Sequence, residues 1–217
     1  MILKIDEINK RAIPYKEYFG VMNLTKKQIE DRIRFSERME DELLTFYYLF
    51  SMMKDLSVSN DKILENQLRQ VYLDVLVSVG IEPDDYLTER ANTFAIEFVA
   101  VTREHIGDIL LDKDLTPAQK WYLSADRLMF NAENEANTAL NYVEYKDAVK
   151  RFKYKTWHTE NDERVRPTHV PLEGQTIPIT ETFVVGETLM RFAKDVEYAA
   201  DSPEEIVNCR CSTTYHN

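Results

Sequence analysis

The side chains that could bind a metal or do acid–base chemistry gather near the C-terminus. Three of the four histidines and both cysteines lie between Tyr154 and Asn217. Cys209 and Cys211 are spaced C-x-C, and His169 precedes them. Two thiolates and an imidazole suit zinc, and a fourth group would complete a tetrahedral site. A small module with a thin core would gain stability from such a metal.

The sequence leaves the fourth ligand and the state of the cysteines open. His158, Asp162 or a water could complete the site. The spacing differs from the usual zinc-finger spacings, so two alternatives remain: reduced cysteines packed without a metal, and a catalytic thiol. We expect one structural zinc and no other cofactor.

Charged residues near His169 offer no recognisable catalytic set. Asp162 and Arg166 lie four residues apart, which predicts a local helical pair worth a few tenths of a kcal/mol, ended by Pro167. A buried Arg166 that holds carbonyl groups would matter more. The chain has no G-x-S-x-G, P-loop or H-E-x-x-H motif, and no nucleophile, base and orienting group are recognisable together. We therefore expect no catalytic residue.

A basic strip at the junction between helix and strand is the candidate contact for nucleic acid. It consists of Lys150, Arg151, Lys153 and Lys155. A solvated edge is the simpler interpretation, because the net charge of −11 argues against a broad grip on phosphates.

Composition indicates a globular protein. The 217 residues are 44% hydrophobic, which suggests one or two domains with a real core. There is no signal segment and no run of about 18 apolar residues. We expect no membrane partner and a cytoplasmic location unless another assembly carries the chain.

Four helices are expected before the chemical residues. Thr25 and Gln28 form a capping box that starts the first helix. A second helix follows a turn at 57–61 and ends at Gly80. A third begins near Pro83, and a fourth runs from Thr116 to about residue 149. Helical spacing predicts a buried stripe of Phe35, Met39, Leu43, Phe46, Phe50 and Met53.

The pattern changes near residue 150. Short β-like runs appear at 152–157, 176–179 and 208–215, separated by Pro and Gly. We predict an α+β protein in which residues 1–150 form a helical domain and residues 151–217 a small α+β module. Residues 1–23 form either an arm that packs on another surface, such as a partner subunit, or a frayed terminus with a short helix.

The tail resembles a known family. The order W-x-T-x-x-D-x-x-V-R-x-x-H-x-x-L-x-G, followed by N-C-R-C, is similar to the C-terminal domain of phage Mu F-like proteins, over about residues 125–215. These are minor head, or head morphogenesis, proteins of tailed bacteriophages and prophages. The matching positions are Trp157, Thr159, Asp162, Val165, Arg166, His169, Leu172, Gly174, Phe183, Asn208, Cys209, Arg210 and Cys211.

The resemblance implies a structural virion component. Such a protein would be made in the host bacterial cytoplasm and lie in the head interior, in few copies and within a larger assembly. It would contact the portal or the major capsid protein and act in head assembly and in DNA packaging or delivery, with at most a weak DNA contact. One departure is Phe130-Asn131-Ala132-Glu133, where the family tends to carry Ala-Arg-Thr-Glu.

Two other functions remain open. A nuclease or an ADP-ribosyl-transferring toxin would need Arg166 and His169 to converge with Glu133 or Asp162 in one open cleft. A factor derived from a head protein would instead bind portal or capsid subunits and interfere with or regulate the phage. A structural module should have Arg166 and His169 buried and fully bonded.

Overall fold

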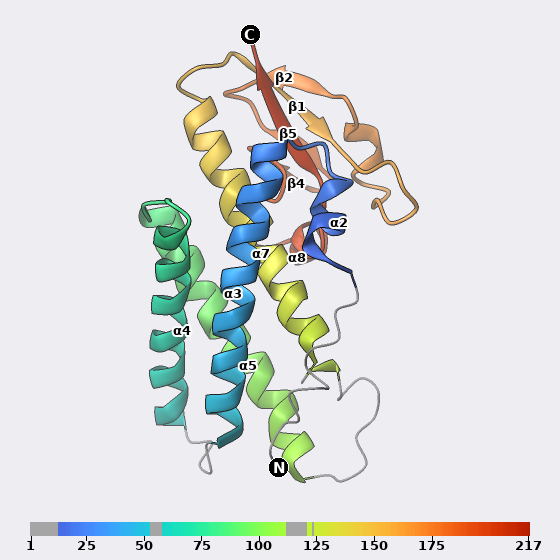
Figure 1. The fold of residues 1–217 in the computed structure, drawn as a ribbon. Coiled ribbons are helices and arrows are strands. Elements are labelled where there is room, and N and C mark those ends of the chain that lie inside the picture. The colour runs from blue at the N-terminus through green and yellow to red at the C-terminus, as the bar shows by residue number, and fades with distance from the viewer. Residues whose placement is uncertain (1–12, 53–57, 112–120, 123) are drawn as a thin grey trace. The chain divides into compact units, whose positions relative to one another are not determined.

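The computed structural model describes residues 13–52, 58–111, 121–122 and 124–217 (Figure 1). Long helices are followed by short antiparallel strands, which confirms the predicted α+β class. The described residues fall into two compact units. One lies within residues 34–132, and the other consists of residues 13–33 and 133–217. The division at residue 150 stays a prediction about domains, but the compact unit around the tail also takes in residues 133–150 and the arm.

The first unit is an aromatic-rich helical bundle. It contains the larger part of α3 (Lys26–Met52), α4 (Val58–Ser78), α5 (Asp85–Leu111) and the start of α7 (Ala125–Ala148). Figure 1 shows α4 and α5 packed side by side. The ring centroids of Tyr72 and Phe94 lie 5.5 Å apart, and those of Tyr47 and Phe98 lie 5.8 Å apart.

The predicted apolar stripe of α3 is core. Phe35, Met39, Leu43 and Phe46 are at most 4% exposed, whereas Phe50 and Met53 lie outside the residues whose side chains are described.

The helix ends follow the predicted capping chemistry. The Thr25 N–H donates to Gln28 Oε1 at 2.8 Å, and the Gln28 N–H donates to Thr25 Oγ1 at 3.3 Å, as a capping box requires. Gly80 ends α4 with φ +85°, a left-handed conformation that glycine adopts without strain. Asp84 Oδ1 accepts from the Leu87 N–H at 3.1 Å and starts α5.

The predicted starts of the second and fourth helices had different outcomes. The turn at 57–61 was wrong over residues 58–61, which form the first turn of α4. Ser, Asn and Asp suit a first helical turn as well as a loop, because they stabilise its free N–H groups. The predicted start at Thr116 lies outside the described residues, and α7 is described from Ala125.

The second unit is built on a three-stranded antiparallel sheet of order β2-β1-β5. Its strands are β1 (Tyr154–His158), β2 (Thr176–Pro178) and β5 (Ser212–His216), close to the three predicted runs. A separate hairpin, β3 (Phe183–Val185) with β4 (Thr188–Met190), was not predicted. The 3₁₀ turn η1 (Val170–Leu172) and the short helix α8 (Pro203–Ile206) complete the unit.

The arm belongs to this unit. Its described part holds α2 (Tyr15–Gly20), in which Tyr15 and Phe19 are at most 2% exposed. Ser212 Oγ, at the start of β5, donates to the Asn23 carbonyl at 3.2 Å. The arm therefore packs on its own chain, in the compact unit that contains the tail.

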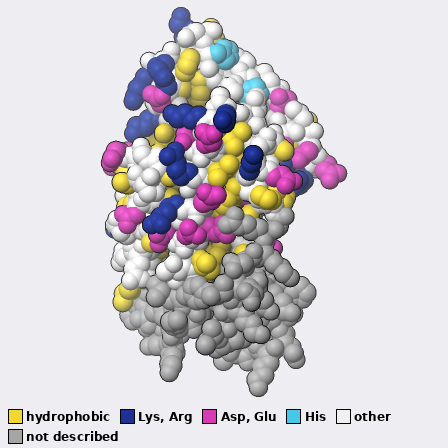
Figure 2. All heavy atoms as spheres, in the orientation of Figure 1, with side chains coloured by type: hydrophobic (Ala, Val, Ile, Leu, Met, Phe, Trp, Pro, Cys, Tyr) yellow, Lys and Arg dark blue, Asp and Glu magenta, His cyan; other side chains and the backbone are white. Residues whose placement is uncertain are grey.

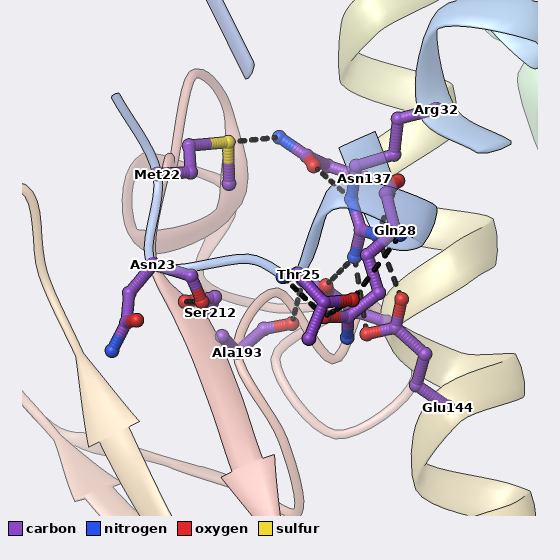
Figure 3. Close-up of polar contacts among 10 residues, drawn as sticks. Met22, Asn23, Thr25, Gln28, Arg32, Asn137, Glu144, Ala193 and Ser212 are labelled. Carbon is purple, nitrogen blue, oxygen red and sulfur yellow. Dashed lines mark hydrogen bonds and ion pairs between the residues drawn. The ribbon is translucent and has the colours of Figure 1, made fainter. Parts of the chain in front are cut away.

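A buried arginine joins the first turns of α3 to α7 within the same unit (Figure 3). Arg32 is 0% exposed. Its guanidinium donates to Asn137 Oδ1 at 3.0 Å, to Asn141 Oδ1 at 2.7 Å and to Glu144 Oε1 at 2.7 Å. Asn141 in turn donates to the Ala193 carbonyl at 2.8 Å. These bonds fix α7 against the segment that leads to the C-terminal cysteines.

Candidate metal centre

His169, Cys209 and Cys211 converge as the sequence predicts. His169 Nδ1 lies 3.3 Å from the Cys211 sulfur and 3.7 Å from the Cys209 sulfur. Their candidate ligand atoms all lie within 4.8 Å of one another, and all three residues are buried. Neither cysteine is in a disulfide. Among the described residues this is the one His, Cys, Asp or Glu group with such close spacing.

Local backbone geometry places the two sulfurs. α8 ends at Ile206, whose carbonyl accepts from the Cys209 N–H at 3.1 Å. Asn208 then adopts a positive φ of 60°, which asparagine tolerates better than most residues. This turn sends the chain through Cys209 and Cys211 directly into β5.

A carboxylate fixes the orientation of the His169 ring. Nε2 lies 2.9 Å from Glu205 Oε2, and the Thr168 hydroxyl donates to the same oxygen at 2.8 Å. The Trp157 ring packs edge-on against His169, with centroids 5.7 Å apart. A proton on Nε2 that bonds to Glu205 leaves Nδ1 free to face the sulfurs.

Hydrogen bonds and burial shift the pKa values of the two thiols in opposite directions. The bond from Cys211, followed by the bond from His169, holds the pKa of Cys209 well below its ordinary value, although burial opposes this. The same bond to Cys209, and burial, raise the pKa of Cys211. Burial, the largest single influence, lowers the pKa of His169, but the hydrogen bond to the Cys209 sulfur and the negative charge of Cys209 and Glu205 together raise it. Of the two thiols, Cys209 is therefore the more acidic.

Sequence reasoning missed Glu205. It stands four residues before Cys209 in the Pro-Glu-Glu stretch. Its only signal is a carboxylate close in sequence to the cysteines, and that signal cannot say which of Glu204 and Glu205 points inward. In the structure Glu205 is 7% exposed, and Glu204 is exposed.

A shallow pocket opens onto the cluster. Its lining consists of Glu160, Arg164, Val165, Arg166, His169, Asn208, Cys209, Arg210 and Cys211. Burial raises the pKa of Glu160 to about 7, although Arg210 opposes this. The Arg166 guanidinium donates to the Val207 carbonyl, so Arg166 is half-buried and bonded to backbone.

His158 and Asp162, the two residues predicted as a possible fourth ligand, bond to other residues. Arg210 Nη2 donates to both carboxylate oxygens of Asp162 at 2.7 Å, so the predicted helical pair of Asp162 and Arg166 was wrong. Residues 162–166 form turns rather than a helix. His158 Nε2 lies 2.8 Å from the Thr214 hydroxyl on the sheet. Neither His158 nor Asp162 belongs to the close group.

The remaining motif residues have structural partners. Gly174 has a φ of +71°, and its N–H donates to the Trp157 carbonyl at 2.9 Å. The Thr159 hydroxyl donates to Glu173 Oε2 at 2.8 Å. These bonds close the loop between β1 and β2, which carries His169.

The predicted basic strip includes one residue that cannot meet nucleic acid. Lys155 is 0% exposed, and its ammonium donates to the carbonyls of Ile179 and Arg191. It lies on the same face of β1 as the buried Trp157. The other strip residues, Lys150, Arg151 and Lys153, are exposed. On the face drawn in Figure 2, Lys and Arg side chains lie among Asp and Glu side chains.

Two acidic residues of α7 are shielded from solvent. Glu135 is 1% exposed, and Glu133 is half-buried. Burial raises the pKa of Glu133 to about 8, although Lys194 opposes this. Neither Glu133 nor Asp162 is among the residues that line the pocket beside His169.

Comparison with known proteins identifies the C-terminal part. Residues 107–214 match the family model described as Phage Mu protein F like protein. The chain carries a Phage Mu F-like domain. The resemblance on the tail residues is thereby confirmed, and this family indicates a phage head morphogenesis protein with a place in the virion. No curated protein and no solved structure matches the chain. Among the described helices, none combines the length and apolar character that a membrane crossing needs.

Proposed function

We propose that this chain is a structural minor head protein of a tailed bacteriophage or prophage. It contacts the portal or the major capsid protein at the inner head surface, and acts in head morphogenesis and in DNA packaging or delivery. The Phage Mu F-like domain over residues 107–214 is the observation that carries this proposal. Synthesis in the host cytoplasm precedes its incorporation into the head.

The bonding of the charged residues supports a structural role. His169 is buried with both ring nitrogens facing partners, and Arg210 is held in a two-point pair with Asp162. Glu205 accepts hydrogen bonds from both His169 and Thr168. A catalytic site keeps such groups available to a substrate, whereas a structural module uses them to hold its own loops.

An exposed apolar pair offers a surface for a head subunit. Val184 and Leu189 face each other across the β3–β4 hairpin and are 63% and 46% exposed. Tyr198, 48% exposed, lies next to the hairpin, because its carbonyl accepts from the Thr188 hydroxyl. Large exposed apolar and aromatic side chains of this kind are common at the centres of protein interfaces.

A complementation experiment tests the role. The gene would be deleted from the phage or prophage that encodes it, and the chain supplied in trans as wild type or as the Val184→Asp/Leu189→Asp variant. We expect deletion to reduce DNA-filled heads. The hairpin variant should lower recovery of the chain with heads by about tenfold or more, as loss of an apolar interface centre does.

The matched control is Val149→Asp. Val149 is exposed to a similar extent, at 43%, and lies just after α7 in the same unit. It should leave incorporation unchanged. A chain that binds portal or capsid subunits but lowers phage yield would instead be an interference factor, and normal heads after deletion would contradict the proposal.

A further inference from the structure

We propose that His169 Nδ1 and the sulfurs of Cys209 and Cys211 bind one zinc ion, oriented by Glu205, and that this ion holds the C-terminal segment to the loop that carries His169. The inference rests on the geometry of the cluster and is independent of the role in the head.

The atom positions match what zinc requires. Zinc binds nitrogen at about 2.0–2.1 Å and thiolate sulfur at about 2.3 Å, so a tetrahedral site separates its nitrogen and sulfur ligands by about 3.5 Å. The measured Nδ1–sulfur separations of 3.3 and 3.7 Å lie on either side of that value. The three candidate ligand atoms also lie within 4.8 Å of one another, close enough to share one ion.

The surroundings of the ligands fit a metal better than a bare thiol pair. Glu205 accepts from Nε2 of His169, the carboxylate–histidine arrangement that orients zinc ligands in many proteins. The indole Nε1–H of Trp157 is buried and directed at the Cys211 sulfur, and this contact opposes the rise in the pKa of Cys211. Trp157 packs on His169 in the core cluster that also contains both cysteines. A buried indole donor beside these sulfurs suits anionic, metal-bound thiolates, which accept hydrogen bonds more strongly than neutral thiols.

The fourth position faces the pocket. Cys209, Cys211 and His169 all line it, and Glu160 is the one carboxylate residue in its lining. Asp162, by contrast, has both oxygens occupied by Arg210. A water or Glu160 therefore completes the coordination from the pocket side.

The ion would join segments that are distant in sequence. His169 precedes η1, and the cysteines lie between α8 and β5. The cysteines belong to a small core cluster of ten buried residues, which also contains Trp157 against the His169 ring. A metal that closes this long loop adds stability because the unfolded chain has no preformed site.

Metal analysis of the full chain tests the proposal. The protein would be produced in zinc-supplemented medium, dialysed and analysed for metals, and the stripped protein titrated with Co²⁺ alone. We expect about one zinc per chain, and a thiolate-to-cobalt charge-transfer band with tetrahedral d–d absorption on Co²⁺ addition. Absence of both signals, with both thiols open to a disulfide reagent, would overturn it.

Two variants that retain all three proposed ligands test the site without removing a residue that binds the metal. Glu205→Gln retains all three ligands and the shape of the site, and should weaken zinc affinity by roughly 10–100-fold, as loss of such a carboxylate does elsewhere. His158→Asn removes a histidine that contacts Thr214 and Glu173 rather than the cluster, and should leave affinity unchanged. Equal affinities for Glu205→Gln and wild type would contradict the assigned orientation of His169, and zinc lost in His158→Asn would place the site elsewhere.

Discussion

Replacing Arg32 by alanine should destabilise the unit that contains the C-terminal module more than any exposed charge change would. The guanidinium is fully buried and makes five hydrogen bonds within this unit, to Gln28, Asn137, Asn141 and both oxygens of Glu144. Its removal leaves a carboxylate and two amide groups without their donor. Breaking a buried ion pair costs about 3–5 kcal/mol.

The exposure of the Arg32 partners decides where in the range of about 3–5 kcal/mol the loss should fall. The Glu144 side chain is 20% exposed, so water can partly replace the lost donor, whereas Asn137 and Asn141 are at most 2% exposed. We therefore expect a loss near the lower end, about 3 kcal/mol. Arg32→Lys keeps the charge but cannot reproduce the planar fork, so it should also be destabilising.

Urea unfolding followed by tryptophan fluorescence measures this loss. Trp157 is buried in this unit, and Trp121 belongs to the other, so a Trp121→Phe background makes the signal specific. Lys26→Ala is the control, because Lys26 lies on the same helix and in the same unit, in an exposed pair with Glu30, and should change stability by less than about 0.5 kcal/mol. A loss below about 1 kcal/mol for Arg32→Ala would refute the reasoning.

Two further changes test the electrostatics and the turns. Glu133→Gln should raise the free energy of unfolding by about 1–2 kcal/mol near pH 8.5 and leave it unchanged near pH 4. Because burial raises the pKa of Glu133 to about 8 in the folded chain, this carboxyl lowers the stability of the fold as the pH rises above its ordinary pKa of 4.5, and its partial exposure limits the size of this loss. Urea unfolding at both pH values checks the prediction, and an equal effect at both would contradict it. Gly174→Ala should cost about 1 kcal/mol, since only its φ of +71° opposes a side chain. Gly186→Ala should cost more, because its new Cβ would lie 2.7 Å from the fixed Glu205 carboxylate, and similar melting temperatures for the two variants would count against that ordering.

Local signals predicted much of the fold. The Thr25–Gln28 capping box, the glycine that ends α4 and the apolar stripe of α3 are each decided within a few residues, and each was confirmed. The convergence of His169 with the cysteines was also predicted, because few residue types form such a site.

Other features depend on long-range packing that a linear reading does not contain. Glu205 and Arg32 find their partners across 36 and more than 100 residues. Lys155 is buried because three distant carbonyls surround it, although its two-residue spacing from Trp157 already indicated a shared strand face. The hairpin at Gly186 had a recognisable two-residue turn between short β-branched runs, which the longer variable segment obscured.

The most direct test of the head-protein role is the amount of this chain in purified, DNA-filled heads of the phage or prophage that encodes it. Quantitative mass spectrometry would compare it with the portal and major capsid proteins. We expect the chain to be present in far fewer copies than the capsid protein and to stay with the heads after purification. Its complete absence from intact heads, with abundant free protein in the lysate, would contradict that role.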